Sequence, residues 1–180
     1  MSEYAVFTAP GTVQIERLLP GPIERIWAYL TESDKRGRWL AAGDMQFEAG
    51  GRVELVFRNS ELTQNDDPAP AKYAEMSGEA VMTGRIIACK PPRLLAYTWG
   101  GGAPGEGSEV RFELTPRGDK VLLVVTHDGF KKFDDITRVA GGWHAHLGIL
   151  ADRLEGREPE GFWRTHTRLE AEYEKRLRAG

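Results

Sequence analysis

The last third of the chain carries a stripe of apolar residues at helical spacing. The members recur every three or four positions, and they are Ile136, Val139, Trp143, Leu147, Leu150 and Leu154. This period predicts one long amphipathic helix, which starts near Asp134 or Asp135, either of which can cap it, and ends before Gly156 and Pro159. A helix with one apolar face needs a concave surface to bury it, and any space left beside it is a natural pocket.

The residues before this helix alternate between apolar and polar, which predicts β-strands. The predicted strands cover residues 13–19, 44–48, 52–58, 76–89, 93–99, 109–115 and 120–127. Gly50 and Gly51 predict a hairpin between the second and third strands, because both glycines tolerate positive φ. Residues 117–119 predict a hairpin between the last two strands, and Gly78 and Gly84 mark bends in the longest one. Short connections of this kind favour an antiparallel sheet.

Two short helices are predicted after the first strand. Residues 20–22, with the sequence Pro-Gly-Pro, stop that strand and open a helix. The apolar side of this helix is formed by Ile23, Ile26, Trp27 and Leu30. Ser33 or Asp34 can cap a second helical piece over residues 35–40, which would turn Trp39 inward. A last helix, over residues 163–177, has an apolar stripe formed by Leu169, Tyr173 and Leu177.

Two segments resist regular structure. Residues 60–73 are rich in Asn, Asp and Pro and predict a long mobile loop, whose position at the end of a hairpin suits a lid. Residues 100–107 form a glycine-rich connection that contains a GxGxxG pattern at 100–105. The dinucleotide fingerprint requires a helix after the last glycine, whereas a strand is predicted here. We therefore expect a hairpin connection and no nucleotide site.

Several motifs follow one another in a defined order along the chain. They are residues 15–19, Pro22-Ile23-Glu24-Arg25-Ile26-Trp27, Arg38-Trp39-Leu40, Gly50-Gly51, residues 94–99, Thr126-His127-Asp128-Gly129-Phe130, and Gly142-Trp143 with Leu147, Leu150 and Leu154. Together they cover about residues 12–155 and resemble the START-like (SRPBCC) superfamily, in the branch similar to the C-terminal domain of the activator of the ninety-kilodalton heat-shock protein's ATPase.

This resemblance implies an α+β helix-grip fold. In it a curved antiparallel sheet of six to seven strands wraps around the long C-terminal helix, with two short helices after the first strand. We expect one such domain over residues 1–156 and an extra C-terminal helix in an extension over residues 157–180.

Composition and charge narrow the functional classes. Of the 180 residues, 41% are apolar and 28% charged, which is typical of a soluble domain. The net charge of −3 and the even spread of Lys and Arg give no basic stripe for nucleic acid, and no apolar stretch is long enough to span a bilayer. Cys89 is the single cysteine, and residues 1–10 do not resemble a secretory signal. We expect a cytoplasmic protein with no nucleic-acid partner and no membrane insertion.

No set of residues dictates a reaction. The four histidines are His127, His144, His146 and His166. His144 and His146 lie two positions apart on the predicted helix and so diverge by about 200°, whereas zinc-binding helices use a spacing of four. His127 is expected to make structural hydrogen bonds at the end of a strand, and His144 is the candidate polar group inside the fold. We predict no metal site, no cofactor and no catalytic residue.

In the resembled fold, aromatic residues surround the space between the sheet and the long helix, which implies a set of candidate ligand-binding residues. They are Trp39, Phe47, Phe57, Met82, Tyr97, Trp99, Phe112, Trp143, His144 and Leu147. Met45 and Met76 can add adaptable surface, because thioether side chains accept irregular shapes. Two interpretations stay open: these side chains fill a solid core, or they line a cavity.

Three functional hypotheses follow. The first is binding, without catalysis, of a small and largely apolar or aromatic molecule in such a cavity. The second, implied by the resemblance, is a chaperone-associated or regulatory interaction module or a homodimer. Its candidate contact residues are Trp163, Leu169, Tyr173 and Leu177. The third is a cyclase- or aromatase-like enzyme, as some START-like relatives are, which would need a titratable group inside the fold, with His144, Glu79 and Arg85 as candidates.

Overall fold

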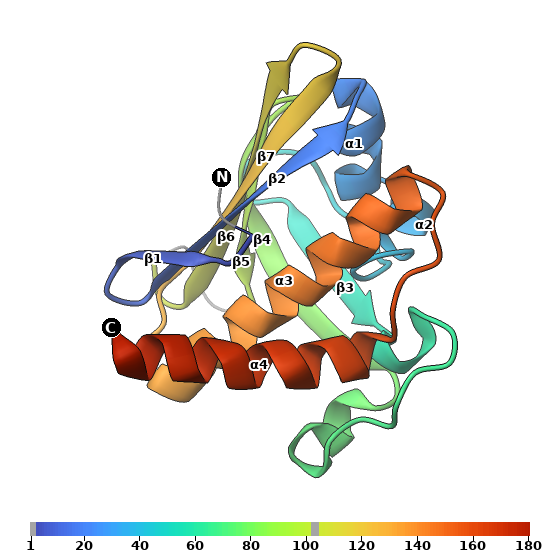
Figure 1. Cartoon of the computed structure of the whole chain (residues 1–180). Helices are drawn as coiled ribbons and strands as arrows, with labels where there is room; N and C mark the ends of the chain where they lie inside the picture. The colour runs from blue at the N-terminus through green and yellow to red at the C-terminus, as the bar shows by residue number, and fades with distance from the viewer. Residues whose placement is uncertain (1–2, 102–104) are drawn as a thin grey trace.

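The computed structural model describes residues 3–101 and 105–180. Within these residues, seven strands form one antiparallel sheet in the order β1-β2-β7-β6-β5-β4-β3, and the sheet curves around a long helix (Figure 1). The strands are β1 (Val6–Ala9), β2 (Thr12–Pro20), β3 (Arg52–Phe57), β4 (Ala80–Lys90), β5 (Leu94–Trp99), β6 (Ser108–Arg117) and β7 (Lys120–Asp128). The predicted α+β helix-grip fold is confirmed. Part of the predicted glycine-rich connection, 102–104, lies outside the described residues.

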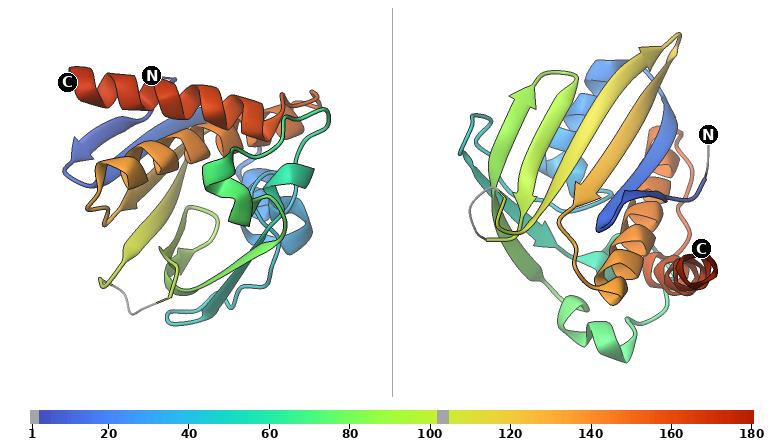
Figure 2. Two further views of the ribbon diagram at one scale, coloured as in Figure 1. Left: turned by 90° about the horizontal axis from the view of Figure 1, so that it is seen from below. Right: turned by 90° about the vertical axis from the view of Figure 1, so that its left-hand side faces the viewer.

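In the described part of the chain, four α-helices accompany the sheet. They are α1 (Ile23–Thr31), α2 (Ser33–Arg36), α3 (Phe133–Leu154) and α4 (Phe162–Ala179), with two short 3₁₀ helices, η1 (Asn59–Glu61) and η2 (Ala71–Met76). Helix α3 crosses the concave side of the sheet, and α4 packs on α3 on the side away from the sheet (Figure 2). The expected stripe of α3 is mostly buried, with Leu147 and Leu150 at 0% exposure.

Three details of the sheet differ from the prediction. The sequence pattern does not predict β1, which pairs with β2 at the edge of the sheet. The predicted strand over residues 44–48 is wrong: this region makes only isolated bridges from Ala42 to Val56 and from Met45 to Val53. Strand β4 begins at Ala80 instead of Met76, because the residues before it form η2.

The two predicted side-chain caps are also wrong. Helix α2 covers 33–36 instead of 35–40, and Ser33 uses its hydroxyl to accept a hydrogen bond from the backbone N–H of Gly43. Helix α3 starts one residue before Asp134, so Asp134 and Asp135 lie within its first turn, with no side-chain cap at Lys132. Carboxylates in a first turn still interact favourably with the helix dipole.

The predicted loop over residues 60–73 is fastened to α4. The carboxylate of Asp66 accepts hydrogen bonds from the backbone N–H groups of Trp163 and Arg164, and the hydroxyl of Thr63 accepts one from Phe162. These are the N–H groups that the first turn of a helix leaves without intrahelical acceptors. The loop therefore supplies the N-terminal cap of a helix about 100 residues later in the chain, which the prediction of a mobile lid did not foresee.

Candidate functional site

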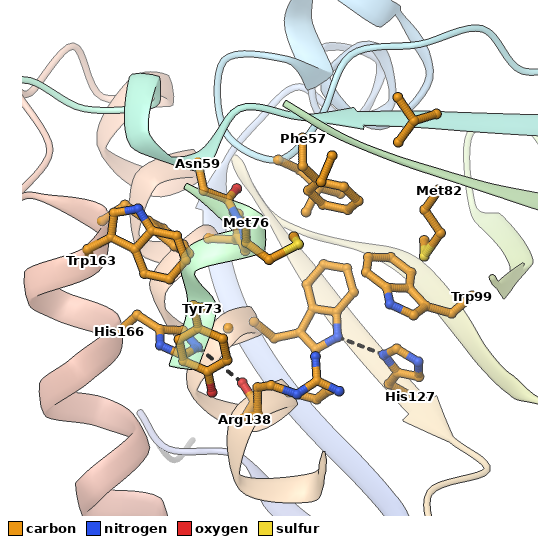
Figure 3. A pocket seen from close by; sticks show the side chains of 18 residues that line it. Phe57, Asn59, Tyr73, Met76, Met82, Trp99, His127, Arg138, Trp163 and His166 are labelled. Carbon is orange, nitrogen blue, oxygen red and sulfur yellow. Dashed lines mark hydrogen bonds between the residues drawn. The ribbon is translucent and has the colours of Figure 1, made fainter. Parts of the chain in front are cut away.

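A cavity of about 280 Å³ lies between α3 and the ends of β3, β4 and β5 (Figure 3). Segments η1 and η2 and the start of α4 complete its wall. The lining residues are Leu40, Phe57, Asn59, Tyr73, Met76, Ala80, Val81, Met82, Trp99, His127, Arg138, Val139, Gly142, Trp143, His146, Phe162, Trp163 and His166. Ligand pockets typically measure about 300–1,000 Å³, so this volume suits a small molecule.

The position of the cavity follows from where the strands end. Val53, Leu55 and Phe57 alternate on the buried face of β3, and Phe57 is the last residue of that strand. Likewise Tyr97 and Trp99 share one face of β5, and Trp99 is its last residue. The side chains deep in the sheet fill the core, whereas those at the strand ends border the cavity.

Aromatic rings, including the imidazoles of three histidines, make up half of the lining residues. Trp99 and Trp143 meet edge to face with ring centroids 5.3 Å apart, and Phe57 lies 5.8 Å from Trp99. On the side next to α4, Tyr73 stacks on Trp163 with centroids 5.8 Å apart. Such pairs are worth about 0.5–1.5 kcal/mol beyond the area they bury, which helps to hold the wall in place.

His127 is a neutral ring with one tautomer. The indole Nε1–H of Trp143 donates a hydrogen bond of 2.9 Å to Nδ1 of His127. Burial lowers the pKa of His127 to about 3, so the ring is uncharged at neutral pH. Because an indole N–H can only donate, Nδ1 must be the acceptor and the ring proton must sit on Nε2. Nε2 is buried and has no hydrogen-bond partner among the described residues.

Burial also keeps the rings of His146 and His166 neutral. Nδ1 of His146 lies 2.8 Å from the carbonyl oxygen of Trp39, which can only accept, so Nδ1 carries the proton and Nε2 is left as an acceptor. Burial lowers the pKa of His146 to about 4 and also lowers the pKa of His166. The interior of the cavity therefore presents imidazole rings without positive charge at neutral pH.

Asn59 is the remaining buried polar side chain of the wall. It is 5% exposed, and its Oδ1 has no hydrogen-bond partner within residues 3–101 and 105–180. Figure 3 shows its amide turned toward Met76 and Phe57, away from the helix α4. Among the described residues, Arg138 is the one lining side chain with a full charge; it lies at the exposed rim, where it pairs with Asp135 at 3.3 Å.

Four of the ten predicted ligand-binding residues line this cavity: Phe57, Met82, Trp99 and Trp143. Trp39, Tyr97, Phe112 and Leu147 are at most 1% exposed and fill the neighbouring part of the core. Phe47 is 43% exposed and does not face the cavity, because the strand that was to turn it inward does not form. Met76 lines the cavity as expected of an adaptable side chain, and Met45 does not.

His144 points to the other side of α3. Its Nδ1 lies 2.8 Å from the hydroxyl of Tyr173 on α4, and burial lowers its pKa to about 4. The polar group of α3 inside the cavity is His146, two positions further along. The sequence alone shows that these two side chains diverge by about 200° on the helix, but it does not show which of them faces the sheet.

The other titratable groups proposed for an enzyme are at the surface. Glu79 pairs with Arg58, with both side chains about half exposed, and Arg85 is exposed as well. Among the described residues no group of three His, Cys, Asp or Glu side chains is placed to hold a metal ion. Within the same residues, no helix is long and apolar enough to cross a membrane.

The proposed protein-interaction face of α4 is used inside the chain. Trp163, Leu169 and Tyr173 are at most 5% exposed, because they pack on α3, the loop before β4 and the N-terminal residues, and only Leu177 is half-buried. Tyr173 accepts a hydrogen bond from the backbone N–H of Ala5 at 2.7 Å. Three lining residues were not predicted from the sequence, because they come from a segment expected to be mobile and from the extension: Tyr73, Phe162 and Trp163.

The sheet, the long helix and the cavity between them define a helix-grip protein. Its family is also shown: the chain belongs to the family described as activator of Hsp90 ATPase homolog 1-like protein, whose model matches residues 20–155. A search of the curated proteins gave no match.

Solved structures with the same fold extend over most of the chain. A Bordetella parapertussis protein, solved by NMR, is 46% identical, with a TM-score of 0.80 over 96% of this chain and 89% of that chain. CalU16 from Micromonospora echinospora is 22% identical, with a TM-score of 0.64 over 93% and 86%. The Aha1 dimer from Colwellia psychrerythraea is 17% identical, with a TM-score of 0.59 over 80% and 96%. The last two similarities concern the fold alone.

Proposed function

We propose that the protein binds a small, largely apolar molecule in the cavity beside α3, without catalysing a reaction. The observation that supports this most is the cavity itself, about 280 Å³ of space walled by aromatic and methionine side chains. A solid core would leave no such volume, because protein interiors pack as densely as organic crystals.

The expected affinity is modest. A ligand that loses about 300 Å² of apolar surface gains roughly 7 kcal/mol at about 25 cal/mol/Å². Association costs several kcal/mol, so binding should be micromolar or weaker unless polar contacts add to it. The proposed site residues are Phe57, Asn59, Tyr73, Met76, Met82, Trp99, Trp143 and Trp163.

The same geometry argues against acid–base catalysis. A general base works best when its pKa is near the working pH. Burial lowers the pKa of His127 to about 3 and that of His146 to about 4, so both rings are weak bases at neutral pH. Each ring also has one nitrogen engaged by a buried protein group.

We also propose that residues 157–180 complete the site instead of forming a separate appendage. Phe162, Trp163 and His166 belong to α4, and all three line the cavity. A protein without α4 would lose one wall of the cavity and the cap contacts that fasten residues 60–73.

Two glycines of α3 allow a matched test. A Cβ atom at Gly142, which lines the cavity, meets only Nε2 of His166 at 3.9 Å, whereas one at Gly148 meets nothing within 4 Å. Gly142→Met should fill the cavity with a flexible side chain, and Gly148→Met is the control on the same helix. The neutral fluorophore N-phenyl-1-naphthylamine serves as the probe.

We expect the fluorescence of the probe to rise on binding to the full chain and to the Gly148→Met protein, with at least tenfold weaker binding to the Gly142→Met protein. Native mass spectrometry of freshly purified protein would show any molecule retained from the cell. Equal binding by the two variants, or no binding by the unaltered chain, would refute the proposal.

A further inference from the structure

We infer that the ligand is an uncharged aromatic molecule with a hydroxyl or N–H group on its ring, and that Asn59 determines this preference by accepting the hydrogen bond. The inference rests on the proposed function and adds the chemical class of the ligand. It depends on how the buried polar groups of the cavity are satisfied.

The amide oxygen of Asn59 is the first observation. Buried polar groups nearly always have a partner, and leaving one without any destabilises a protein. Oδ1 of Asn59 has none among the described residues, although the residue is only 5% exposed. The amide is turned toward Met76 and Phe57, beside the space that the rings enclose (Figure 3). A donor on the ligand would supply the missing partner.

The second observation is that the interior offers no charge to a ligand. His127, His146 and His166 are all neutral, since burial lowers the pKa of each ring. Arg138 is the single cation that the described part of the chain contributes to the lining, and it is already paired with Asp135 at the exposed rim. Placing a carboxylate among the rings would remove it from water without a counter-charge, which is costly.

The third observation concerns the shape and chemistry of the walls. Trp99 and Trp143 meet edge to face, as do Phe57 and Trp99, so flat ring surfaces border the space. Aromatic guests gain from offset stacking and edge-to-face contact in addition to area burial. His127 carries a proton on Nε2 that has no acceptor. A hydroxyl oxygen can both donate and accept, so hydroxylated rings suit both kinds of unpaired group.

Isothermal titration calorimetry of the full chain with four related probes tests this inference. The probes are naphthalene, 2-naphthol, 2-methoxynaphthalene and 2-naphthoate, which share one ring system and differ in the polar group. We expect 2-naphthol to bind about tenfold more tightly than naphthalene or the methyl ether, since one hydrogen bond contributes on the order of 1 kcal/mol. The carboxylate should bind most weakly.

Asn59→Leu removes the acceptor and keeps the size of the side chain. In this variant the tenfold preference for 2-naphthol should fall to about twofold or less, while naphthalene binds at least as well as before. The melting temperature of the unliganded variant should rise, because a buried oxygen without a partner has been removed. Asn59→Ala, which also removes the acceptor, is a second variant should the leucine protein fold poorly, and the preference for 2-naphthol should be lost in it as well.

The outcomes separate the two proposals. Equal affinity for naphthalene and 2-naphthol, or a preference that survives Asn59→Leu, would overturn the role of Asn59 but leave the cavity as an apolar site. If 2-naphthoate bound most tightly, the inference would be overturned, and pairing of a carboxylate with Arg138 would explain the preference instead. Failure of all four probes to bind would refute the proposed function itself.

Discussion

The space between the sheet and α3 contains two regions with similar residues and different packing. In the filled region, Trp39, Phe112 and Leu147 are at most 1% exposed and do not line the cavity. In the hollow region, Phe57, Met82, Trp99 and Trp143 surround about 280 Å³. The two regions touch, since the rings of Phe112 and Trp143 lie 5.6 Å apart.

The difference lies in what covers each region. Trp39, from the chain that follows α2, is inserted into the filled region and its indole N–H donates to the carbonyl of Tyr29 in α1 at 2.8 Å. The hollow region is covered by η2 and the start of α4, which contact each other through Tyr73 and Trp163 and leave space beneath. Aromatic composition alone therefore does not decide between a solid core and a site; the covering segments do.

The largest expected contrast is the cost of truncating a side chain in each region. Leu147→Ala should lower the free energy of unfolding by about 3 kcal/mol, because it removes a fully buried side chain from close packing. Met82→Ala should lose only about 1 kcal/mol, since Met82 is half-buried and already borders empty space. Urea denaturation of both variants measures this. Equal losses would mean that the two regions pack alike.

The neutral histidines of the hollow region predict a strong dependence of stability on pH. The folded-state pKa is about 3 for His127 and about 4 for His146, against 6.5 for an ordinary histidine. Between those values and 6.5 the unfolded chain binds protons that the folded chain does not, so stability falls as the pH is lowered. Between pH 6.5 and pH 5.5, each of the two rings should lower the free energy of unfolding by about 1 kcal/mol.

Urea denaturation between pH 5 and 8 would show this slope. His144 lies outside the hollow region, but its folded-state pKa is also about 4, so it should contribute a similar loss of stability as the pH falls. His127→Gln and His146→Gln should each reduce the slope by the contribution of one proton. A stability that stays flat below pH 6.5 would contradict the buried, neutral state of these rings.

The sheet and the long helix that enclose the two regions could be predicted well from the sequence. Alternation and the spacing of the α3 stripe depend on periods that burial imposes on every strand and helix, so most of the strands and the long helix were found. Caps and the burial of charged groups depend on single contacts between distant residues. Arg36 illustrates this: it is 1% exposed, and its guanidinium donates to backbone carbonyls of Leu30, Ala41 and Gly43, which no periodicity reveals.

The site was predicted less completely, and for a physical reason. Strand parity identifies which side chains face α3, but not whether they lie deep in the sheet, like Tyr97, or at a strand end, like Trp99. The covering residues were missed because residues 60–73 look too polar to pack. Their order comes from Asp66 and Thr63, which bind N–H groups of α4.

Three glycines of α3 give a finer test of the packing around the hollow region. Gly142→Ala and Gly148→Ala should each raise the free energy of unfolding by up to about 1 kcal/mol, because alanine favours the helix and the new Cβ meets no close atom. A Cβ at Gly141 would lie 3.2 Å from the backbone nitrogen of Glu170, so Gly141→Ala should lower stability by pushing α4 away.

Thermal or urea unfolding of the three alanine variants checks the signs. Of the two stabilising changes, only Gly142→Ala should also weaken binding of the apolar probe, since Gly142 lines the cavity and Gly148 does not. A stabilised Gly141→Ala protein would show that α3 and α4 are further apart than in this structure.

The smallest expected effect on stability concerns Glu170, which holds the cover of the hollow region. Its carboxylate accepts hydrogen bonds from the ammonium group of Lys72 and the hydroxyl of Tyr73, both in η2. Burial alone would raise the pKa of Glu170, but these two hydrogen bonds and the electrostatic attraction of neighbouring groups such as Lys72 together lower the pKa. Glu170→Gln keeps the shape and removes the charge, and because Lys72 is 63% exposed the loss in stability should stay below about 1 kcal/mol.

The consequence for ligand exchange should be larger than the consequence for stability. Tyr73 and Met76 form the wall of the cavity that Glu170 fastens to α4, so weaker fastening lets that wall open more often. Stopped-flow dissociation of the apolar probe from the Glu170→Gln protein should be several-fold faster than from the unaltered chain. Glu174→Gln, which breaks only an exposed pair with Arg178 on the same helix, is the control and should leave the rate unchanged. Equal dissociation rates for all three proteins would mean that ligands leave by a path that does not involve η2.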